Sequence, residues 1–478
     1  MNFEEVKRQE QENLMPTYGR FPVALVYGKG AVAVDTEGKE YIDFTSGIGV
    51  NSLGYCDDGW VSAVAKQAGA IQHMSNLYYS PVQTSLAAEL CRLTGFGRVF
   101  FCNSGAEANE CAIKLARKYS ADKYGKQRTE IVTLVNSFHG RTVTTLAATG
   151  QDVFHEHFWP FTEGFSYARA NDFESLLSCV TENTCAVLIE LIQGEGGVMP
   201  LEKEFVRKTA ALCKEKDILL MIDEVQTGVG RTGSLYCYEQ YGIEPDVITS
   251  AKGLGGGLPI GACLCASRLG EVLGAGMHGT TFGGNPVSCA GGLEVLQRVA
   301  KDSFLRSVEE KGRYLREKLS KMTGVQELRG LGMMIGIVLA KDNAKEVAGR
   351  CVKNGLLVLT AKTVLRLLPP LNITYEAVSY THLDVYKRQG QWIPPPPERE
   401  MSPGSAWGKG ESICRYGQDG SKRNWIKKPM ILIPLSLLTV KWRGRISRAL
   451  SPTPPCWDSA ESLTKARLTQ SAKGWKGF

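Results

Sequence analysis

A single lysine, Lys252, stands between an apolar run and a glycine-rich segment in VITSAKGLGGGLPIGA. Asp223 holds a comparable place 29 residues earlier, at the end of the apolar run ILLMID. Both runs have the length and composition of buried strands, so two strand ends are expected to bring an amine and a carboxylate to the same edge of a sheet. A partly desolvated amine has a lowered pKa and can attack an aldehyde. The pair therefore indicates covalent chemistry at Lys252.

Each residue also has a simpler interpretation when it is taken alone. Lys252 is then a solvated lysine, and Asp223 is a loop acid or a helix cap. The glycines after Lys252 suggest a phosphate-binding loop, but their order argues against one. A P-loop places its lysine after the glycines and before a helix, whereas Lys252 precedes them and Pro259 follows soon after.

A phosphate site is predicted elsewhere, in FFCNSGAEANE. This stretch reads as strand, turn and helix, which leaves free backbone N–H groups near Ser104, Gly105 and Ala106 at a helix N-terminus. An ordinary serine cap with Glu107 in the first helical turn fits the same residues. The stretch is therefore consistent with an anion site or with a cap alone.

The segment HGTTFGGNP supplies two further hydroxyls, Thr280 and Thr281, although such a segment alone is more often just a turn. Together these groups suit a ligand that has an aldehyde, a ring nitrogen and a phosphate. Pyridoxal 5′-phosphate has all three: Lys252 would form the Schiff base and Asp223 would keep the pyridine nitrogen protonated. Phe138, in NSFHGRT, is an aromatic side chain that could stack on the ring.

An open α/β sheet is expected to position these groups within residues 55–285. Apolar runs without alternation are typical of strands buried on both faces of a mostly parallel sheet. These runs are RVFFCN, EIVTLVN, CAVLIEL, ILLMIDEV and DVITSA, separated by helical stretches such as EANECAIKLARKYSADKYG and EKEFVRKTAALCKEKD. The ligand of such a sheet lies at the carboxyl ends of its strands.

A smaller α+β domain is predicted for residues 286–378, where a long helix is followed by LRGLGMMIGIVLA, GLLVLTA and VLRLLPPL. The N-terminal segment 1–54, whose D-T-E-G-K turn indicates a β-hairpin, is expected to join it. The large domain is then 55–285, with a cleft between two lobes.

The pattern breaks after Val378, where a closing amphipathic helix is expected. The string SYTHLDVYKRQ resembles a translated adapter or assembly artefact, and we interpret residues 379–478 as a non-native, disordered tail; the alternative is a genuine basic appendage. Since this tail carries 17 basic against 7 acidic residues, it accounts for the whole formal charge of +7. That charge therefore gives no support for nucleic-acid binding.

Targeting and metal signals are lacking in the sequence. The N-terminus has no apolar stretch of the secretory type, and the longest apolar run, ILIPLSLLTV, is far shorter than the roughly 20 residues of a membrane span. The 14 cysteines are scattered without zinc-type spacing, so reduced, mostly buried thiols and no metal site are expected. We expect a cytoplasmic protein that acts on neither nucleic acid nor membrane.

Eight motifs between about residue 15 and residue 378 resemble those of the class III, fold-type I aminotransferases, and most closely those of the acetylornithine aminotransferases. They are FFCNSGAEANE, FHGRT, IQGEGGV, IDEVQTGVGRTG, AKGLGGGLPIGA, HGTTFGGNP, LRGLGMMIG and LRLLPPLN. The resemblance implies a large domain with a mostly parallel seven-stranded sheet, a smaller α+β domain and pyridoxal 5′-phosphate as cofactor. Two departures are Leu191, where the family usually has proline, and the loss of the family pattern after Val378.

The resemblance also implies roles for single residues. The cofactor-binding residues would be Ser104, Gly105, Ala106, Phe138, Asp223, Glu224, Val225, Gln226, Lys252 and Thr281. Among them Gln226 would lie beside the phenolic oxygen. Thr281 would reach the phosphate of the neighbouring subunit, which implies a homodimer with shared active sites.

Two arginines are assigned to substrate by the same resemblance, since guanidinium groups bind carboxylates in bidentate fashion. Arg141 would bind the α-carboxylate of the amino donor, with Thr280 nearby. Arg366 would bind 2-oxoglutarate and pair with Glu195 while the donor is bound. The simpler alternatives are a surface arginine for Arg141 and a loop acid for Glu195.

The choice of donor depends on TSGIGVN, where ornithine aminotransferases tend to carry a tyrosine and this chain has Gly47 and Gly49. Small residues leave room for an acyl group, which favours N2-acetylornithine as donor to 2-oxoglutarate, with N-acetylglutamate 5-semialdehyde and glutamate as products. Succinylornithine, succinyldiaminopimelate, ornithine and 4-aminobutyrate are alternative donors. An aminomutase and a non-catalytic cofactor-binding regulator are the alternatives from other functional classes.

Overall fold

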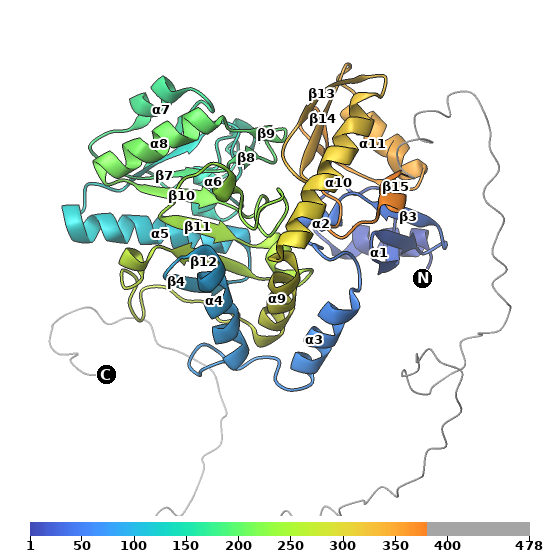
Figure 1. The fold of residues 1–478 in the computed structure, drawn as a ribbon, viewed down its shortest axis with the longest axis horizontal. Helices are drawn as coiled ribbons and strands as arrows, with labels where there is room; N and C mark the ends of the chain where they lie inside the picture. Colours follow the sequence, from blue (N-terminus) through green and yellow to red (C-terminus); the bar gives the residue numbers. More distant parts are fainter. Residues whose placement is uncertain (380–478) are drawn as a thin grey trace, which may run out of the picture. The chain divides into compact units, whose positions relative to one another are not determined.

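A seven-stranded sheet forms the centre of the protein and carries most of the predicted chemistry (Figure 1). The computed structural model describes residues 1–379. The strands of this sheet are β4 (Arg98–Cys102), β5 (Glu130–Leu134), β6 (Phe165–Ala168), β7 (Thr184–Ile189), β10 (Leu219–Asp223), β11 (Val247–Ser250) and β12 (Gly261–Cys265). Their order is β4-β12-β11-β10-β7-β5-β6.

The prediction of a mostly parallel sheet is confirmed. β11, β10, β7, β5 and β6 pair in parallel, and β12 runs antiparallel to both of its neighbours. Five strands coincide with the predicted apolar runs. β6 and β12 were not predicted, because FSYA and GACLC are short and contain polar or small residues that weaken the apolar signal.

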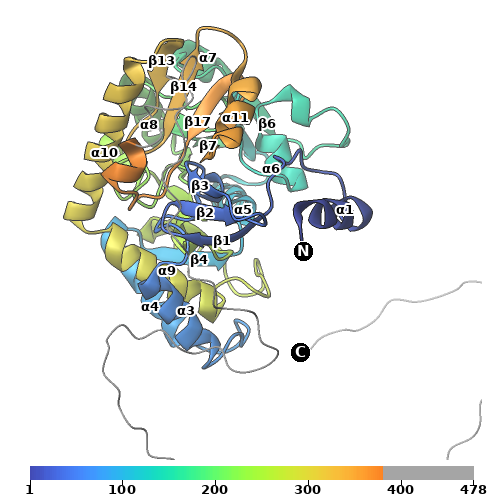
Figure 2. The same cartoon turned by 90° about the vertical axis from the view of Figure 1, so that its right-hand side faces the viewer.

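Helices cover both faces of this sheet and continue beyond it. The main helices are α1 (Phe3–Asn13), α2 (Ser46–Gly49), α3 (Asp58–Ala68), α4 (Pro81–Thr94), α5 (Gly105–Tyr124), α6 (Val143–Ala148), α7 (Phe173–Cys179), α8 (Lys203–Lys216), α9 (Pro286–Val299), α10 (Asp302–Ser320) and α11 (Ala344–Lys353). Short 3-10 helices are η1 (Asp152–Phe154), η2 (Cys237–Gln240), η3 (Lys252–Gly255) and η4 (Ser267–Leu269). In both views α3, α4 and α9 lie together (Figures 1 and 2).

The absence of alternation in the strand sequences has a direct cause. Successive residues of the central strands enter two different buried clusters, one on each face of the sheet. Ile189 and Ile222 belong to the cluster that contains side chains of α8, and Leu188 and Met221 to the cluster that contains side chains of α5. Since both faces are covered by helices, most positions in the middle of these strands are apolar.

Two smaller sheets lie beyond the large one. The first has the order β1-β2-β3-β15, formed by β1 (Leu25–Lys29), β2 (Val32–Asp35), β3 (Glu40–Asp43) and β15 (Leu356–Leu357). The second has the order β13-β14-β17-β16, formed by β13 (Val325–Arg329), β14 (Ile335–Leu339), β17 (Val364–Leu367) and β16 (Leu359–Ala361). β2 and β3 form the predicted hairpin, and β15 pairs with β3, so the N-terminal and C-terminal parts of the described chain share one sheet.

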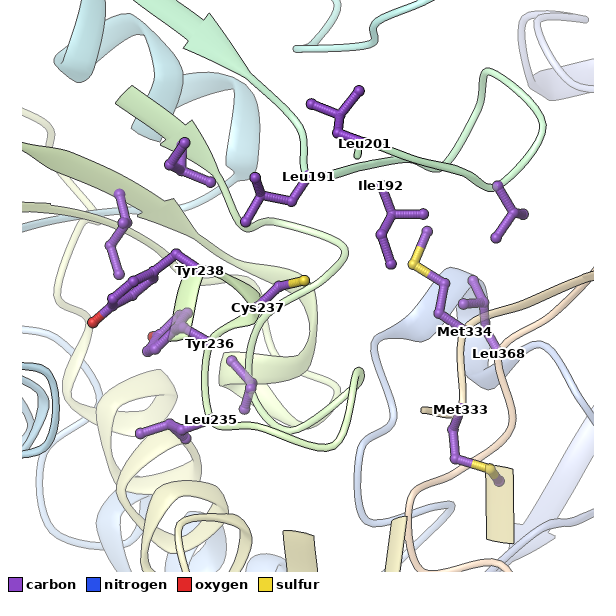
Figure 3. Close-up of a cluster of buried hydrophobic side chains, with 14 of the residues drawn as sticks. Leu191, Ile192, Leu201, Leu235, Tyr236, Cys237, Tyr238, Met333, Met334 and Leu368 are labelled. Atoms are coloured by element: carbon purple, nitrogen blue, oxygen red, sulfur yellow. The ribbon is translucent and has the colours of Figure 1, made fainter. Parts of the chain in front are cut away.

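One buried apolar cluster connects the large sheet to the second small sheet (Figure 3). It extends from Tyr236 and Cys237, which follow β10, to Met333, Met334 and Leu368, which flank β14 and β17. A two-stranded hairpin, β8 (Ile192–Gln193) and β9 (Met199–Pro200), borders the same region. The loops at the carboxyl edge of the large sheet are thus packed against the strands that lead to Arg366.

The closing helix expected near Val378 begins at residue 375, and Val378 is fully buried. Apart from Ser379, the predicted non-native, disordered tail of residues 379–478 lies outside the described residues. Leu191, the departure from the family pattern, is itself buried in the core. None of the helices within residues 1–379 has the length and apolar character needed to cross a membrane.

Candidate active site

Lys252 and Asp223 meet at one edge of the sheet, as their positions in the sequence predict. β10 and β11 are parallel neighbours, and Asp223, the last residue of β10, lies opposite Thr249 of β11. Lys252 follows β11 at the start of η3 with a φ of 41°, a strained conformation for a residue with a side chain. Burial lowers the pKa of the Lys252 amine, although Glu195 and Asp223 act in the opposite direction. The lowered pKa favours the neutral amine that attacks an aldehyde.

Asp223 is held in place by three donors. Its Oδ2 accepts hydrogen bonds from Asn109 Nδ2 at 2.8 Å and lies 2.9 Å from His139 Nδ1. Its Oδ1 accepts from the Val225 backbone N–H at 3.0 Å. Thr249 completes the set, since its hydroxyl donates to Asn109 Oδ1 at 2.8 Å. The carboxylate of Asp223 is therefore fixed in one orientation with two side-chain donors on the same oxygen.

His139, Asn109 and Glu190 are site residues that were not predicted from the sequence. The His139 side chain is fully buried, and its Nε2 has no hydrogen-bond partner within residues 1–379. Glu190 accepts from the backbone N–H groups of Phe138 at 2.9 Å and Gly194 at 3.3 Å, and burial raises its pKa to about 7. His139 stands next to Phe138 in FHGRT, and Asn109 lies one helical turn after Gly105, so their spacing could have revealed both.

The N-terminus of α5 is both a serine cap and an open donor site. Ser104 Oγ accepts from the Glu107 backbone N–H at 3.2 Å, so the cap predicted as the simpler alternative is formed. Gly105 approaches the loop after β10 closely, because a Cβ on Gly105 would lie 2.7 Å from a Val225 methyl group. Ser104, Gly105 and Ala106 also line the cavity next to Lys252. Helix N-termini of this kind bind phosphate groups.

These elements surround a cavity of about 450 Å³, within the range of small-molecule sites. Nine of the predicted residues line it: Ser104, Gly105, Ala106, Phe138, Arg141, Asp223, Val225, Gln226 and Lys252. The three unpredicted residues described above line it as well. The amine, the carboxylate and the helix N-terminus therefore open onto one space.

Arg141 is exposed and lies against aromatic rings. Its guanidinium is 5.5 Å from the centre of the Phe138 ring and 4.0 Å from the centre of the Phe154 ring, which packs edge-on against Phe138. Among the described residues no carboxylate forms an ion pair with Arg141. The group is thus oriented by cation–π contacts and keeps its hydrogen-bond donors available at the cavity.

Arg366 reaches the same region from β17 in the second small sheet. Its side chain is 3% exposed, and Nη1 donates to Glu195 Oε1 at 2.6 Å and to Gln226 Oε1 at 3.1 Å. Its Nε has no partner within the described chain. Arg366 and Glu195 thus form an ion pair in this structure, and neither residue lines the cavity while the pair is closed.

Besides Arg366 and Glu195, three further predicted residues lie outside the cavity lining. The Glu224 carboxylate points into the core, where it accepts hydrogen bonds from Thr227 Oγ1 and from the Tyr238 backbone N–H at 2.8 Å; it holds the loop rather than facing the cavity. Thr280 Oγ1 accepts from Asn103 Nδ2 at 3.1 Å, beside the α5 cap. Thr281 is exposed on the surface. The loop from 278 to 286 therefore lies next to this cavity without lining it.

The sequence matches the aminotransferase class-III family over residues 15–382. The chain belongs to the class III aminotransferases. It is 50% identical over 378 residues to the acetylornithine aminotransferase of Haemophilus ducreyi, covering 79% of this chain and 96% of that protein. It is 46% identical over 376 residues to the acetylornithine aminotransferase of Methanocaldococcus jannaschii, covering 77% and 94%.

Solved structures of class III aminotransferases have the same fold. The N-acetylornithine aminotransferase of Stenotrophomonas maltophilia K279a is similar with a TM-score of 0.69 and 35% identity, over 79% of this chain and 97% of that one. The ornithine aminotransferase of Toxoplasma gondii ME49 gives a TM-score of 0.77 with 30% identity, over 81% and 94%. This class III aminotransferase is therefore an α/β enzyme of fold type I.

The cofactor of class III aminotransferases is pyridoxal 5′-phosphate, and the residues of the cavity fit it. Among the described residues no ion pair involves Lys252, so its amine is available to an aldehyde. The backbone N–H groups at the start of α5 suit a phosphate, and Asp223 suits a protonated ring nitrogen. The cavity thus offers one suitable group for each reactive part of the cofactor.

Proposed function

We propose that this enzyme transfers the δ-amino group of N2-acetylornithine to 2-oxoglutarate, giving N-acetylglutamate 5-semialdehyde and glutamate. The observation that carries this proposal is the ion pair between Arg366 and Glu195 at the border of the cavity. A buried arginine whose partner can turn away serves a substrate that brings its own carboxylate. With Glu195 in place the site accepts a donor that lacks that carboxylate, and the two substrates can alternate.

Each site residue then has a defined task. Asp223 holds the proton on the ring nitrogen, and bound pyridoxal 5′-phosphate supplies an electron sink for the reacting carbon. Lys252 Nζ would move the proton between the δ-carbon of the donor and the cofactor. Gln226 would lie beside the phenolic oxygen, and Phe138 would stack on the ring; both line the cavity. Arg141 binds the α-carboxylate of the donor through the guanidinium that the aromatic rings orient.

The remaining cofactor contacts belong to the same proposal. Ser104, Gly105 and Ala106 would hold the phosphate, and Glu224 and Val225 would contribute to the cofactor site through their backbone. Thr280 contributes a substrate contact beside the α5 cap.

The active unit in this proposal is a cytoplasmic homodimer. Thr281 is exposed, as expected of a hydroxyl that binds the phosphate in a neighbouring subunit. Leu77, Tyr78 and Tyr79 are 88%, 70% and 97% exposed, and Asn76 beside them donates to the Thr280 carbonyl at 3.3 Å. Large exposed apolar side chains of this kind suit a protein interface. The domains would be 1–54 with 286–378, and 55–285, as the sequence predicts.

A donor panel tests the proposal. The purified full chain, loaded with pyridoxal 5′-phosphate, is assayed with acetylornithine, succinylornithine, ornithine and 4-aminobutyrate at fixed 2-oxoglutarate. We expect the highest kcat/KM with acetylornithine. Preference for free ornithine would overturn the donor assignment, and turnover of any donor without added oxo acid would favour an aminomutase.

A further inference from the structure

Arg231 is a buried arginine that the proposed reaction does not use. It lies in the loop between β10 and η2, and its side chain is almost fully shielded from solvent. Within the described chain it has no carboxylate partner: Nη1 donates to the main-chain oxygens of Met333 at 3.3 Å and Pro369 at 2.5 Å, and Nη2 has no partner. A buried charge is costly, so its position calls for an explanation.

The two carbonyls lie at the same end of the strand pair that carries Arg366, where Ile335 of β14 pairs with Leu367 of β17. Met333 precedes β14, whose Gly336 pairs with Arg366 of β17. Pro369 follows Arg366 by three residues at the exit of β17. Met333 also donates its backbone N–H to the Arg231 carbonyl at 2.9 Å. Arg231 therefore fastens one end of the β14–β17 pair, where β14 begins and β17 ends, to the loop after β10.

The same loop touches Arg366 directly. Gln226 accepts from Arg366 Nη1 at 3.1 Å, five residues before Arg231. Gly332, with a φ of 52°, lets the two segments meet, because a Cβ there would lie 2.4 Å from the Thr232 backbone carbon. The apolar cluster of Figure 3 closes the remaining space around Met333 and Leu368. The loop after β10 thus contacts the Arg366 guanidinium directly through Gln226. Through Arg231 the same loop also holds the backbone next to the strand that carries Arg366.

We propose that Arg231 is a positioning residue for Arg366. It fixes the position of β17 relative to the cavity. The Arg366 guanidinium therefore stays in place when a substrate carboxylate replaces the carboxylate of Glu195. This inference rests on the proposed role of Arg366 in binding 2-oxoglutarate. A loosened β17 would impair the half-reaction that needs Arg366 and spare the half-reaction in which acetylornithine is bound through Arg141.

The test measures the two half-reactions separately in the holoenzyme, by the absorbance of the cofactor. The variants are Arg231→Met, which loses both carbonyl bonds, and Arg231→Lys, which keeps the charge with a single donor group. We expect the KM for 2-oxoglutarate to rise about tenfold or more, with the KM and rate for acetylornithine changed less than about threefold. Equal changes in both half-reactions would show a general structural role and overturn the inference. If Arg231→Met does not fold, Arg231→Lys decides.

Arg316 of α10 provides a matched control. It donates to the main-chain oxygens of Gly312 at 3.2 Å, Gly332 at 2.9 Å and Met334 at 3.5 Å, so within the described chain it holds the same segment without a hydrogen bond to the loop that carries Arg231. We expect Arg316→Met to lower the melting temperature and to leave the ratio of the two half-reactions unchanged. A selective loss of 2-oxoglutarate binding in Arg316→Met would contradict the special role of Arg231.

Arg366→Gln separates this inference from the proposed function. If Arg231 acts through Arg366, adding Arg231→Lys to Arg366→Gln causes no further rise in the KM for 2-oxoglutarate, whereas additive effects would overturn the inference. If Arg366→Gln itself leaves that KM unchanged, the proposed role of Arg366 is wrong and the inference falls with it. If only the Arg231 variants have no effect, the proposed function stands without the inference.

Discussion

Replacing Glu195 by glutamine should strengthen the binding of 2-oxoglutarate. In this structure Glu195 Oε1 lies 2.6 Å from Nη1 of the buried Arg366 guanidinium. A substrate carboxylate must therefore first displace the carboxylate of Glu195. A hydrogen bond to a charged group contributes about 1.5–3 kcal/mol, and a neutral amide acceptor provides roughly half of that. Glu195→Gln therefore lowers the cost of displacement by about 0.8–1.5 kcal/mol, which corresponds to a KM for 2-oxoglutarate about 4- to 13-fold lower.

The assay is the second half-reaction, in which the amino form of the cofactor is mixed with increasing 2-oxoglutarate and its absorbance is followed. Glu327→Gln is the control, because it removes another arginine partner, that of Arg329 on β13, away from the cavity lining. A KM that stays the same or rises in a folded, cofactor-loaded Glu195→Gln enzyme would refute the idea that Glu195 competes with the substrate. The melting temperature should fall, because Arg366 then keeps its charge with only neutral partners.

Three further predictions follow from the same geometry. Lys252→Ala should abolish turnover and the visible absorbance of the bound cofactor, since the amine that bonds the aldehyde is lost; retained activity would contradict the assignment. Asp223→Asn should lower kcat by about 100-fold or more, because the ring nitrogen loses its counter-charge, with stopped-flow absorbance as the readout. Glu224→Gln should remove a pH-dependent loss of stability: burial raises the pKa of Glu224 to about 7, so the wild type loses up to about 3 kcal/mol as pH rises from about 4.5 to 7. Urea unfolding across that range should show the advantage of the variant growing with pH, and a constant difference would count against it.

The strands that place Lys252 and Asp223 could be predicted because the helices on both faces of the sheet require apolar residues along these strands. A strand covered by helices on both faces is mostly apolar without alternation, and such runs stand out in the sequence. β12 escaped prediction because its residues GACLC are small and follow a glycine-rich turn. The closing of the first small sheet by β15 also could not be predicted, since that strand has two residues and pairs with a partner more than 300 positions away.

Site residues could be predicted from the sequence where they stand at the end of a strand or the start of a helix. They could not be predicted where their role is a hydrogen bond to another side chain of the site. Lys252, Asp223 and the start of α5 follow from the ends of elements. His139 and Asn109 act through Asp223, and that contact depends on the packing of α5 against the sheet. Glu224 shows the converse, because its neighbours in the sequence suggest the cavity while its side chain turns into the core. In a tight loop after a strand, adjacent side chains point in opposite directions, and the sequence alone does not say which one meets the ligand.

The two glycines that favour an acylated donor also allow the backbone to adopt positive φ values in this turn. Gly47 and Gly49 have φ values of 60° and 77°, and Ile48 between them is held at 68°, a strained value for a branched residue. The turn that leads to Val50 at the cavity wall thus has positive φ values over four successive residues, from Ser46 to Gly49, and glycine is the residue that adopts this conformation without strain. A Cβ on Gly47 would meet no atom closer than 3.7 Å, so the turn also leaves space beside Val50. The room for an acyl group and the shape of the turn therefore have the same origin, and a tyrosine in this segment would have to change both.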